Sequence, residues 1–165
     1  IQSFDGGRGY IEKDWGKSFP ESWIWLQSNN FENSDACIMM SIAKIPWLGK
    51  YFTGFLGFLY VKNQFYTFST YNKSEISEIS LINEQLTLTF KNKEYILKIK
   101  AHIKNSGILR APQSGKMTRH IKESVDSELE IELLTVTGNT VYADKASRAG
   151  LEVIEGIFDI VKVKT

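Results

Sequence analysis

Residues 86–103, L-T-L-T-F-K-N-K-E-Y-I-L-K-I-K-A-H-I, carry the most regular pattern in the chain. Apolar side chains occupy every second position on both sides of the polar pair Asn92-Lys93. Alternate residues of a β-strand share a face, so each half predicts a strand with one buried face. The short polar connection predicts that the two strands pair antiparallel as a hairpin.

Similar short runs precede and follow this hairpin. We expect earlier strands over residues 35–44, 55–62, 64–71 and 75–82, and later ones over 128–133, 140–147, 149–155 and 157–163. In the run 128–133 glutamates alternate with apolar residues, which predicts an acidic outer face. Residues 113–122 have little periodicity and are predicted to form a polar loop. About ten short strands, with weak helical periodicity, are typical of a meandering antiparallel barrel.

Three of the four tryptophans lie in residues 8–31, R-G-Y-I-E-K-D-W-G-K-S-F-P-E-S-W-I-W-L-Q-S-N-N-F. We interpret this stretch as two strands interrupted at residues 16–20, because Gly and Pro are unfavourable inside strands. The first strand has a polar face formed by Arg8, Tyr10, Glu12 and Asp14. In the second, one face presents Trp23, Trp25, Gln27 and Asn29, and the other presents Ile24 and Leu26. Indoles followed by amides on one face predict a half-buried pocket for an apolar body with a polar head.

Composition restricts the function classes. The 165 residues fit one domain; 42% are hydrophobic and 24% charged, and the net charge of +1 gives no electrostatic case for nucleic acid. A single cysteine, Cys37, excludes an internal disulfide and favours a reducing, cytoplasmic compartment. His102 and His120 lack further ligands at metal-binding spacing, and no hydrolase or nucleotide-loop motif occurs. We therefore expect neither a metal site nor a cofactor.

The pattern Y-I-E-K-D-W-G-x-S-F-P-x-x-W-I-W-x-Q-x-N-x-F closely resembles the tocopherol cyclase family. Similarity continues, in order, through I-P-W-L-G (45–49), L-R-A-P (109–112) and E-L-E-I-E-L (128–133). The resemblance implies a lipocalin-like (calycin-like) β-barrel and, as activity, closure of a chromanol ring on a prenylated quinol. It covers the C-terminal half of a typical member. We therefore expect residues 1–165 to form a single domain of a longer, two-domain protein, with the N-terminal domain as its partner.

The resemblance also assigns candidate site residues. In the family's reaction an acid protonates the prenyl double bond and a phenol oxygen captures the resulting carbocation. Glu12 is the candidate catalytic acid. The candidate substrate-binding residues are the indoles Trp15, Trp23 and Trp25, which offer faces to the cation, and Gln27, Asn29 and Arg110, which offer polar groups to the quinol oxygens. Asp14 stands where the family pattern often has Asn. Two acids on one face indicate either that like-charge repulsion raises one of the two pKa values or that the chemistry differs from the family's.

A second hypothesis is a lipocalin-like module that binds a hydrophobic small molecule without changing it, since barrel folds serve both purposes. A carboxyl group that faces the apolar cavity favours the enzyme, and one that faces solvent favours the binder. For either function the expected ligand is hydrophobic, with a prenyl quinol as the enzyme's substrate, and peripheral membrane contact is expected. The abundance of Ile, Lys and Asn favours a bacterial source.

Overall fold

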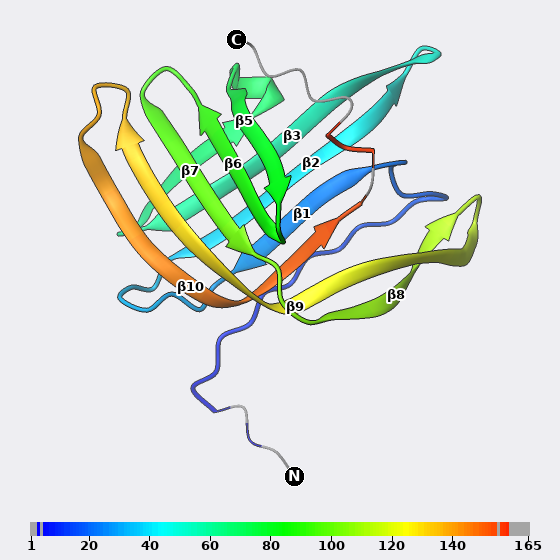
Figure 1. The fold of residues 1–165 in the computed structure, drawn as a ribbon, viewed down its shortest axis with the longest axis horizontal. Coiled ribbons are helices and arrows are strands. Elements are labelled where there is room, and N and C mark those ends of the chain that lie inside the picture. The colour runs from blue at the N-terminus through cyan, green and yellow to red at the C-terminus, as the bar shows by residue number, and fades with distance from the viewer. Residues whose placement is uncertain (1–2, 4, 155, 159–165) are drawn as a thin grey trace.

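The computed structural model describes residues 3, 5–154 and 156–158. Within them the chain forms strands and one short 3₁₀ turn, shown as a strongly curved sheet in Figure 1. The elements are β1 (Trp23–Ser28), β2 (Cys37–Trp47), β3 (Lys50–Val61), β4 (Gln64–Ser69), η1 (Thr70–Asn72), β5 (Glu75–Ile82), β6 (Gln85–Lys91), β7 (Tyr95–His102), β8 (Ser106–Gln113), β9 (Lys116–Thr135) and β10 (Thr140–Val153). None of the described residues forms a helix long and apolar enough to cross a membrane.

The strands lie in the order β4-β3-β2-β1-β10-β9-β7-β6-β5, and every pairing is antiparallel. The first and last strands of the described chain, β1 and β10, meet in the middle of this sheet. Strand β8 pairs with β9 outside the main path. The all-β, antiparallel, calycin-like fold class is therefore confirmed. Among the described residues no pairing joins β4 to β5, so the curved sheet stays open.

The concave side of the sheet holds the main core. The predicted hairpin of residues 86–103 is confirmed as β6 and β7, with Leu88 opposite Ile99. Leu86, Leu88 and Ile99 are fully buried and join an apolar cluster that extends to Ile24 and Leu26 of β1. Burial of a large aliphatic side chain stabilises a fold by roughly 1.5–3 kcal/mol. Side chains with alternating direction thus build this core from nearly every strand.

Two sequence predictions about the end of the sheet are wrong. Residues 113–122 do not form a loop, since they belong to the β8–β9 hairpin. This hairpin exposes most side chains on both of its faces, which removes the alternation that marks a half-buried strand. The two strands expected over 140–155 are one strand, β10, with an irregularity between Ala146 and Ala149. Arg148 there has φ +51°, and such a bulge shifts the alternation that the prediction followed.

Two further expectations concern the ends of the chain. The strand expected over residues 8–14 is absent, because this segment has no hydrogen-bonded neighbour strand. It runs instead as extended chain over the outer surface of the sheet (Figure 1). The strand expected over 157–163 is absent at residues 157–158, and residues 159–163 lie outside the described part of the chain.

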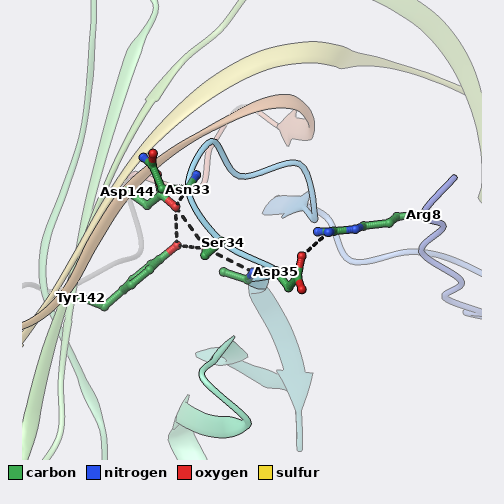
Figure 2. A network of polar contacts seen from close by, with 7 residues as sticks. Arg8, Asn33, Ser34, Asp35, Tyr142 and Asp144 are labelled. Atoms are coloured by element: carbon green, nitrogen blue, oxygen red, sulfur yellow. Dashed lines mark hydrogen bonds and ion pairs between the residues drawn. The ribbon is translucent and has the colours of Figure 1, made fainter. Parts of the chain in front are cut away.

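The loop between β1 and β2 is fastened to β10 by a buried carboxylate, as Figure 2 shows. Asp144 is 8% exposed. Its oxygens lie within hydrogen-bond distance of the Asn33 backbone N–H (3.2 Å) and side-chain amide (2.8 Å), the Ser34 hydroxyl (3.1 Å) and the Tyr142 hydroxyl (3.0 Å). The Lys145 backbone N–H donates a further bond of 2.9 Å. Asp144 thus holds together donors from the loop and from its own strand.

Candidate functional site

A second, smaller apolar cluster lies on the face of the sheet opposite the main core. Its buried members are Trp23, Ala43, Ala111 and Ile121, with Phe19, Trp25, Ile45 and Ile154 packed at its edge. Trp23 and Trp25 alternate along β1 with the core residues Ile24 and Leu26, which places the indoles on the outer face. Large aromatic side chains on the outer face of a sheet mark it as covered or ligand-binding.

This face carries a cavity of about 700 Å³. Its floor comes from β1, β2 and β3, and its walls come from residues 10–20, β8, β9 and β10. The lining is mostly aromatic and aliphatic, and it includes four carboxylates. The lining residues are Tyr10, Glu12, Asp14, Trp15, Ser18, Phe19, Pro20, Trp23, Trp25, Met39, Ser41, Ala43, Ile45, Leu56, Leu109, Glu123 and Glu152.

Segment 17–19 is hydrogen-bonded to the turn of the β8–β9 hairpin. The backbone N–H of Phe19 donates to the Pro112 carbonyl at 3.2 Å, and the N–H of Gly115 donates to the Lys17 carbonyl at 2.6 Å. The Phe19 ring packs edge-on against Trp23, with the centroids 5.8 Å apart. These contacts hold the segment over the sheet without any strand pairing, and so form one wall of the cavity.

Arg119 of β9 ties the same wall to the tryptophan floor. Its guanidinium donates to the backbone carbonyls of Pro20 (2.7 Å) and Glu21 (2.5 Å), and its carbon lies 4.8 Å from the Trp23 ring centroid. A guanidinium can stack on an indole and still use its in-plane N–H donors. Arg119 lies in the stretch predicted to be a loop and was not a predicted site residue, because only the pairing of β8 with β9 brings it to the site.

Glu152 of β10 is the most deeply placed acid of the cavity. The indole N–H of Trp23 donates to its carboxyl at 2.5 Å. Burial raises the pKa of Glu152; the Trp23 hydrogen bond lowers it in part, and the negative charges of Glu123, Glu12 and Asp14 raise it further. Glu123 lies directly opposite Glu152 in the β9–β10 pairing, and burial raises its pKa as well. Two carboxyls side by side in a half-buried site favour retention of a proton.

Glu12 has a different environment. It is exposed at the cavity, where the Trp25 indole N–H donates to it at 3.2 Å and the Tyr10 hydroxyl donates to the same oxygen. Burial raises the pKa of Tyr10, and the hydrogen bond and charge of Glu12 raise it further, so the phenol keeps its proton and stays a donor. The two donors fix the position of the Glu12 carboxyl at the cavity.

Trp23 and Trp25 share the cavity as predicted, and Trp15 lies at the rim with 85% of its surface exposed. Gln27 was expected in the same cavity, and that is wrong, since it is not part of the lining. A Cβ at Gly150, which lies opposite Gln27, would be 2.9 Å from the Trp25 ring. The Trp25 indole therefore packs over Gly150, and it lies between Gln27 and the cavity.

Asn29 and Arg110 also lie outside the lining. Asn29 follows the end of β1. Arg110 is exposed, and its neighbour Leu109 faces the cavity, so strand alternation turns Arg110 away from it. The catalytic role of Glu12 and the binding roles of the six other predicted residues stay predictions.

A further hollow of about 660 Å³ lies on the outer surface of β6, β7, β9 and β10. Here the predicted acidic face of β9 is neutralised by lysines on neighbouring strands. Lys98 pairs with Glu132 at 3.2 Å and Lys145 pairs with Glu130 at 2.9 Å. Solvated ion pairs on a sheet surface explain this hollow without a ligand.

The fold and the site define a class: an all-β, calycin-like domain with a cavity that combines indole faces and half-buried carboxyls. The tocopherol cyclase-like family matches residues 1–155, and the chain belongs to this family. It is 29% identical over 114 residues to the probable chloroplastic tocopherol cyclase of Oryza sativa subsp. japonica and to the chloroplastic tocopherol cyclase of Zea mays.

Each of these alignments covers 66% of this chain and 24% of the plant protein. The chain thus spans only about a quarter of the length of the curated relatives that it matches. No solved structure matches it at a significant level.

Replacing Arg119 with Ala is expected to loosen segment 17–21. Hydrogen bonds from a charged donor contribute about 1.5–3 kcal/mol each. The equilibrium constant for local opening of the segment should therefore rise about tenfold or more. Limited trypsin digestion, followed by mass spectrometry, should show faster cleavage after Lys13 and Lys17. Arg110→Ala removes an exposed arginine from the neighbouring strand and should leave the rates unchanged. Equal rates in wild type and Arg119→Ala would show that Arg119 does not hold the wall.

Proposed function

We propose that this cavity binds a prenylated quinol or related isoprenoid and closes a ring on it by acid-initiated cyclisation. The observation that supports this most directly is the position of Glu152. This acid is half-buried beside Trp23 and opposite Glu123, in surroundings that raise its pKa. A carboxylic acid can protonate an alkene only while it holds its proton, and these surroundings favour that state.

In the proposed step the carboxyl of Glu152 gives its proton to one carbon of the prenyl double bond. The π bond breaks, a C–H bond forms, and the other carbon becomes a tertiary cation. The faces of Trp23 and Trp25 stabilise positive charge near them. The phenol oxygen of the substrate then forms a C–O bond and loses its proton, and return of a proton to the Glu152 carboxylate restores the acid. The substrate and the ring-closed product have the same composition, because the reaction is an isomerisation.

The cavity's apolar floor, with Met39, Ala43, Ile45 and Leu56, supports a hydrophobic ligand for this site. Its walls keep much of the solvent away from Trp23, which is 5% exposed. Exclusion of water protects a carbocation from capture. Since the chain spans a minor part of its relatives' length, the remaining part of the parent protein is a proposed partner that completes the pocket.

The alternative is a binding module that holds a hydrophobic ligand and leaves it unchanged. The mostly apolar lining by itself would serve that purpose equally well. The carboxyl pair of Glu123 and Glu152 is what favours the enzyme, because two acids at the wall of an apolar cavity bring no benefit to simple retention of a lipid.

The test uses the full-length protein in two measurements. Ligands that copurify are identified by mass spectrometry, and prenyl quinols of several chain lengths are assayed for conversion to a product of equal mass with a new ring. Conversion supports the enzyme. Tight binding without conversion of any of these quinols would favour the binding module, and absence of both would remove this substrate class.

Turnover should depend on pH with a definite sign. The acid must be protonated, and the pKa of Glu152 lies above the ordinary value of a glutamate. Turnover is therefore expected to be highest at low pH and to fall as pH rises through the pKa of Glu152. A profile of kcat against pH checks this. Turnover that is flat between about pH 5 and about pH 8 would contradict a carboxylic acid as the proton donor.

A further inference from the structure

The turn between β2 and β3 carries an unusual concentration of exposed apolar side chains. Trp47, Leu48, Tyr51 and Phe52 are all exposed, and Leu48 reaches 88%. Figure 1 shows this turn projecting from the body of the sheet. Soluble surfaces carry single exposed apolar residues routinely, but a contiguous group of this size marks an interaction site.

The conformation of the turn adds a second observation. Leu48 and Gly49 both have positive φ, +46° and +74°, as a two-residue hairpin turn of type I′ requires. Three other two-residue turns in the described chain also have positive φ at both positions. The first residue of these turns is Lys62, Asn83 or Ser114, all of them polar. A bulky leucine in the left-handed region is disfavoured, whereas Asn or Gly is accepted there. The β2–β3 turn therefore exposes a leucine side chain at its outermost point, although leucine is unfavourable in this left-handed backbone conformation.

Apolar side chains lie on both faces of the hairpin tip, with Lys50 opposite Trp47. Trp47 belongs to the outer face that also holds the cavity residue Ile45, and Phe52 lies opposite Ile45. Tyr51 lies opposite Pro46 on the other face. Apolar side chains on both faces of a projecting tip suit immersion in an apolar phase.

We propose that the tip of the β2–β3 hairpin, formed by Trp47, Leu48, Tyr51 and Phe52, inserts into the interfacial region of a lipid bilayer. Trp and Tyr prefer this region because their rings are amphipathic. Lys50 is exposed at the tip opposite Trp47, and residues 44–52 contain no acidic residue, so the tip complements anionic headgroups. Lys44 lies 4.3 Å from the Tyr51 ring centroid but pairs with Glu21 at 2.5 Å, so Lys50 is the cation that the tip offers to headgroups.

The hairpin that carries the apolar tip also contributes to the cavity. Ile45 and Leu56, which line the cavity, belong to the two strands that carry the tip. A hairpin seated in a bilayer would thus bring the cavity's apolar floor close to the lipid phase. The membrane contact does not depend on the proposed chemistry, and it would stand if the cavity only bound its ligand.

The test is sedimentation of the full-length protein with vesicles of phosphatidylcholine, with and without phosphatidylglycerol, in the absence of any quinol. Leu48→Asn suits the left-handed position, so it should raise Tm while it weakens vesicle binding about tenfold. Ile82→Asn removes an apolar side chain that is similarly exposed next to another hairpin turn, and it should bind like wild type. Trp47→Phe should keep binding but lose part of the fluorescence quenching by brominated lipids.

Absence of wild-type binding to both kinds of vesicle would overturn the proposal. So would equal binding by wild type and Leu48→Asn, or an equal loss in Ile82→Asn. If wild type instead self-associates, and Leu48→Asn abolishes this without any vesicle binding by either protein, the tip is a protein interface and the membrane proposal is wrong.

Discussion

Replacing Glu152 with Gln is expected to lower turnover of a prenyl quinol by about 10²–10⁴-fold, the usual contribution of a general acid. The amide has nearly the shape of the acid and can still accept the Trp23 N–H bond. Affinity for the quinol should therefore change little. Steady-state kcat, together with a binding titration that follows tryptophan fluorescence, separates the two effects.

Loss of stability would not explain such a result. The raised pKa of Glu152 means that its favourable contribution to folding is complete below the unfolded pKa, about 4.3, and is lost as pH rises through the folded pKa. At neutral pH the Gln variant is thus expected to be at least as stable as wild type. Thermal denaturation at two pH values checks this.

Three further variants locate the proton donor. Glu123→Gln removes the neighbour's charge and should reduce turnover less than Glu152→Gln does. Glu12→Gln tests the acid predicted from the sequence. Glu130→Gln, on the ion-paired outer surface of β9, serves as the matched control and should be neutral. If Glu12→Gln abolished turnover and Glu152→Gln did not, the assignment of the acid would pass to Glu12.

The second large effect is expected at Asp144. Replacement by Ala removes the acceptor for two backbone N–H groups, an amide and two hydroxyls in a buried site. Buried donors that lose a charged partner are costly, so we expect the free energy of unfolding to fall by about 3 kcal/mol. Urea denaturation measures this value. A loss below about 1 kcal/mol would contradict a structural role for this network.

Asp35→Ala provides the matched control. It lies in the same loop and pairs with Arg8, but both side chains are exposed, and such pairs contribute roughly 0–1 kcal/mol. The dependence on pH gives a second check with Asp144→Asn. Burial alone would raise the pKa of Asp144, but the hydrogen bonds outweigh it and lower the pKa. The advantage of wild type over this variant should be complete above about pH 4 and shrink as pH falls further.

Strand alternation allowed much of the fold to be predicted. Hairpins such as β6–β7 bury one face and expose the other, so their pattern is visible in the residues themselves. The β8–β9 hairpin lacks a buried face over most of its length, and its pattern was therefore invisible. The bulge near Arg148 broke the alternation of β10 and made one strand resemble two.

The site could be predicted only in its local part. Tyr10, Glu12 and Asp14 do face one cavity, because an extended chain alternates its side chains even without a partner strand. Glu152 and Glu123 come from strands more than a hundred residues away from them, and only the pairing of β10 with β1 and β9 brings them beside the tryptophans. A charged residue between apolar ones, as in Leu151-Glu152-Val153, is the one local signal of Glu152 in the sequence.

Proton donation by Glu152 to the prenyl double bond is the central step of the proposed function. The most direct measurement is cyclisation of a prenyl quinol in D₂O by full-length wild type and Glu152→Gln, with mass spectrometry of the product. Wild type should give a product that carries one carbon-bound deuterium, since the exchanged acid supplies that atom, and the variant should give almost no product. A ring-closed product without carbon-bound deuterium, or equal turnover by the variant, would contradict the account.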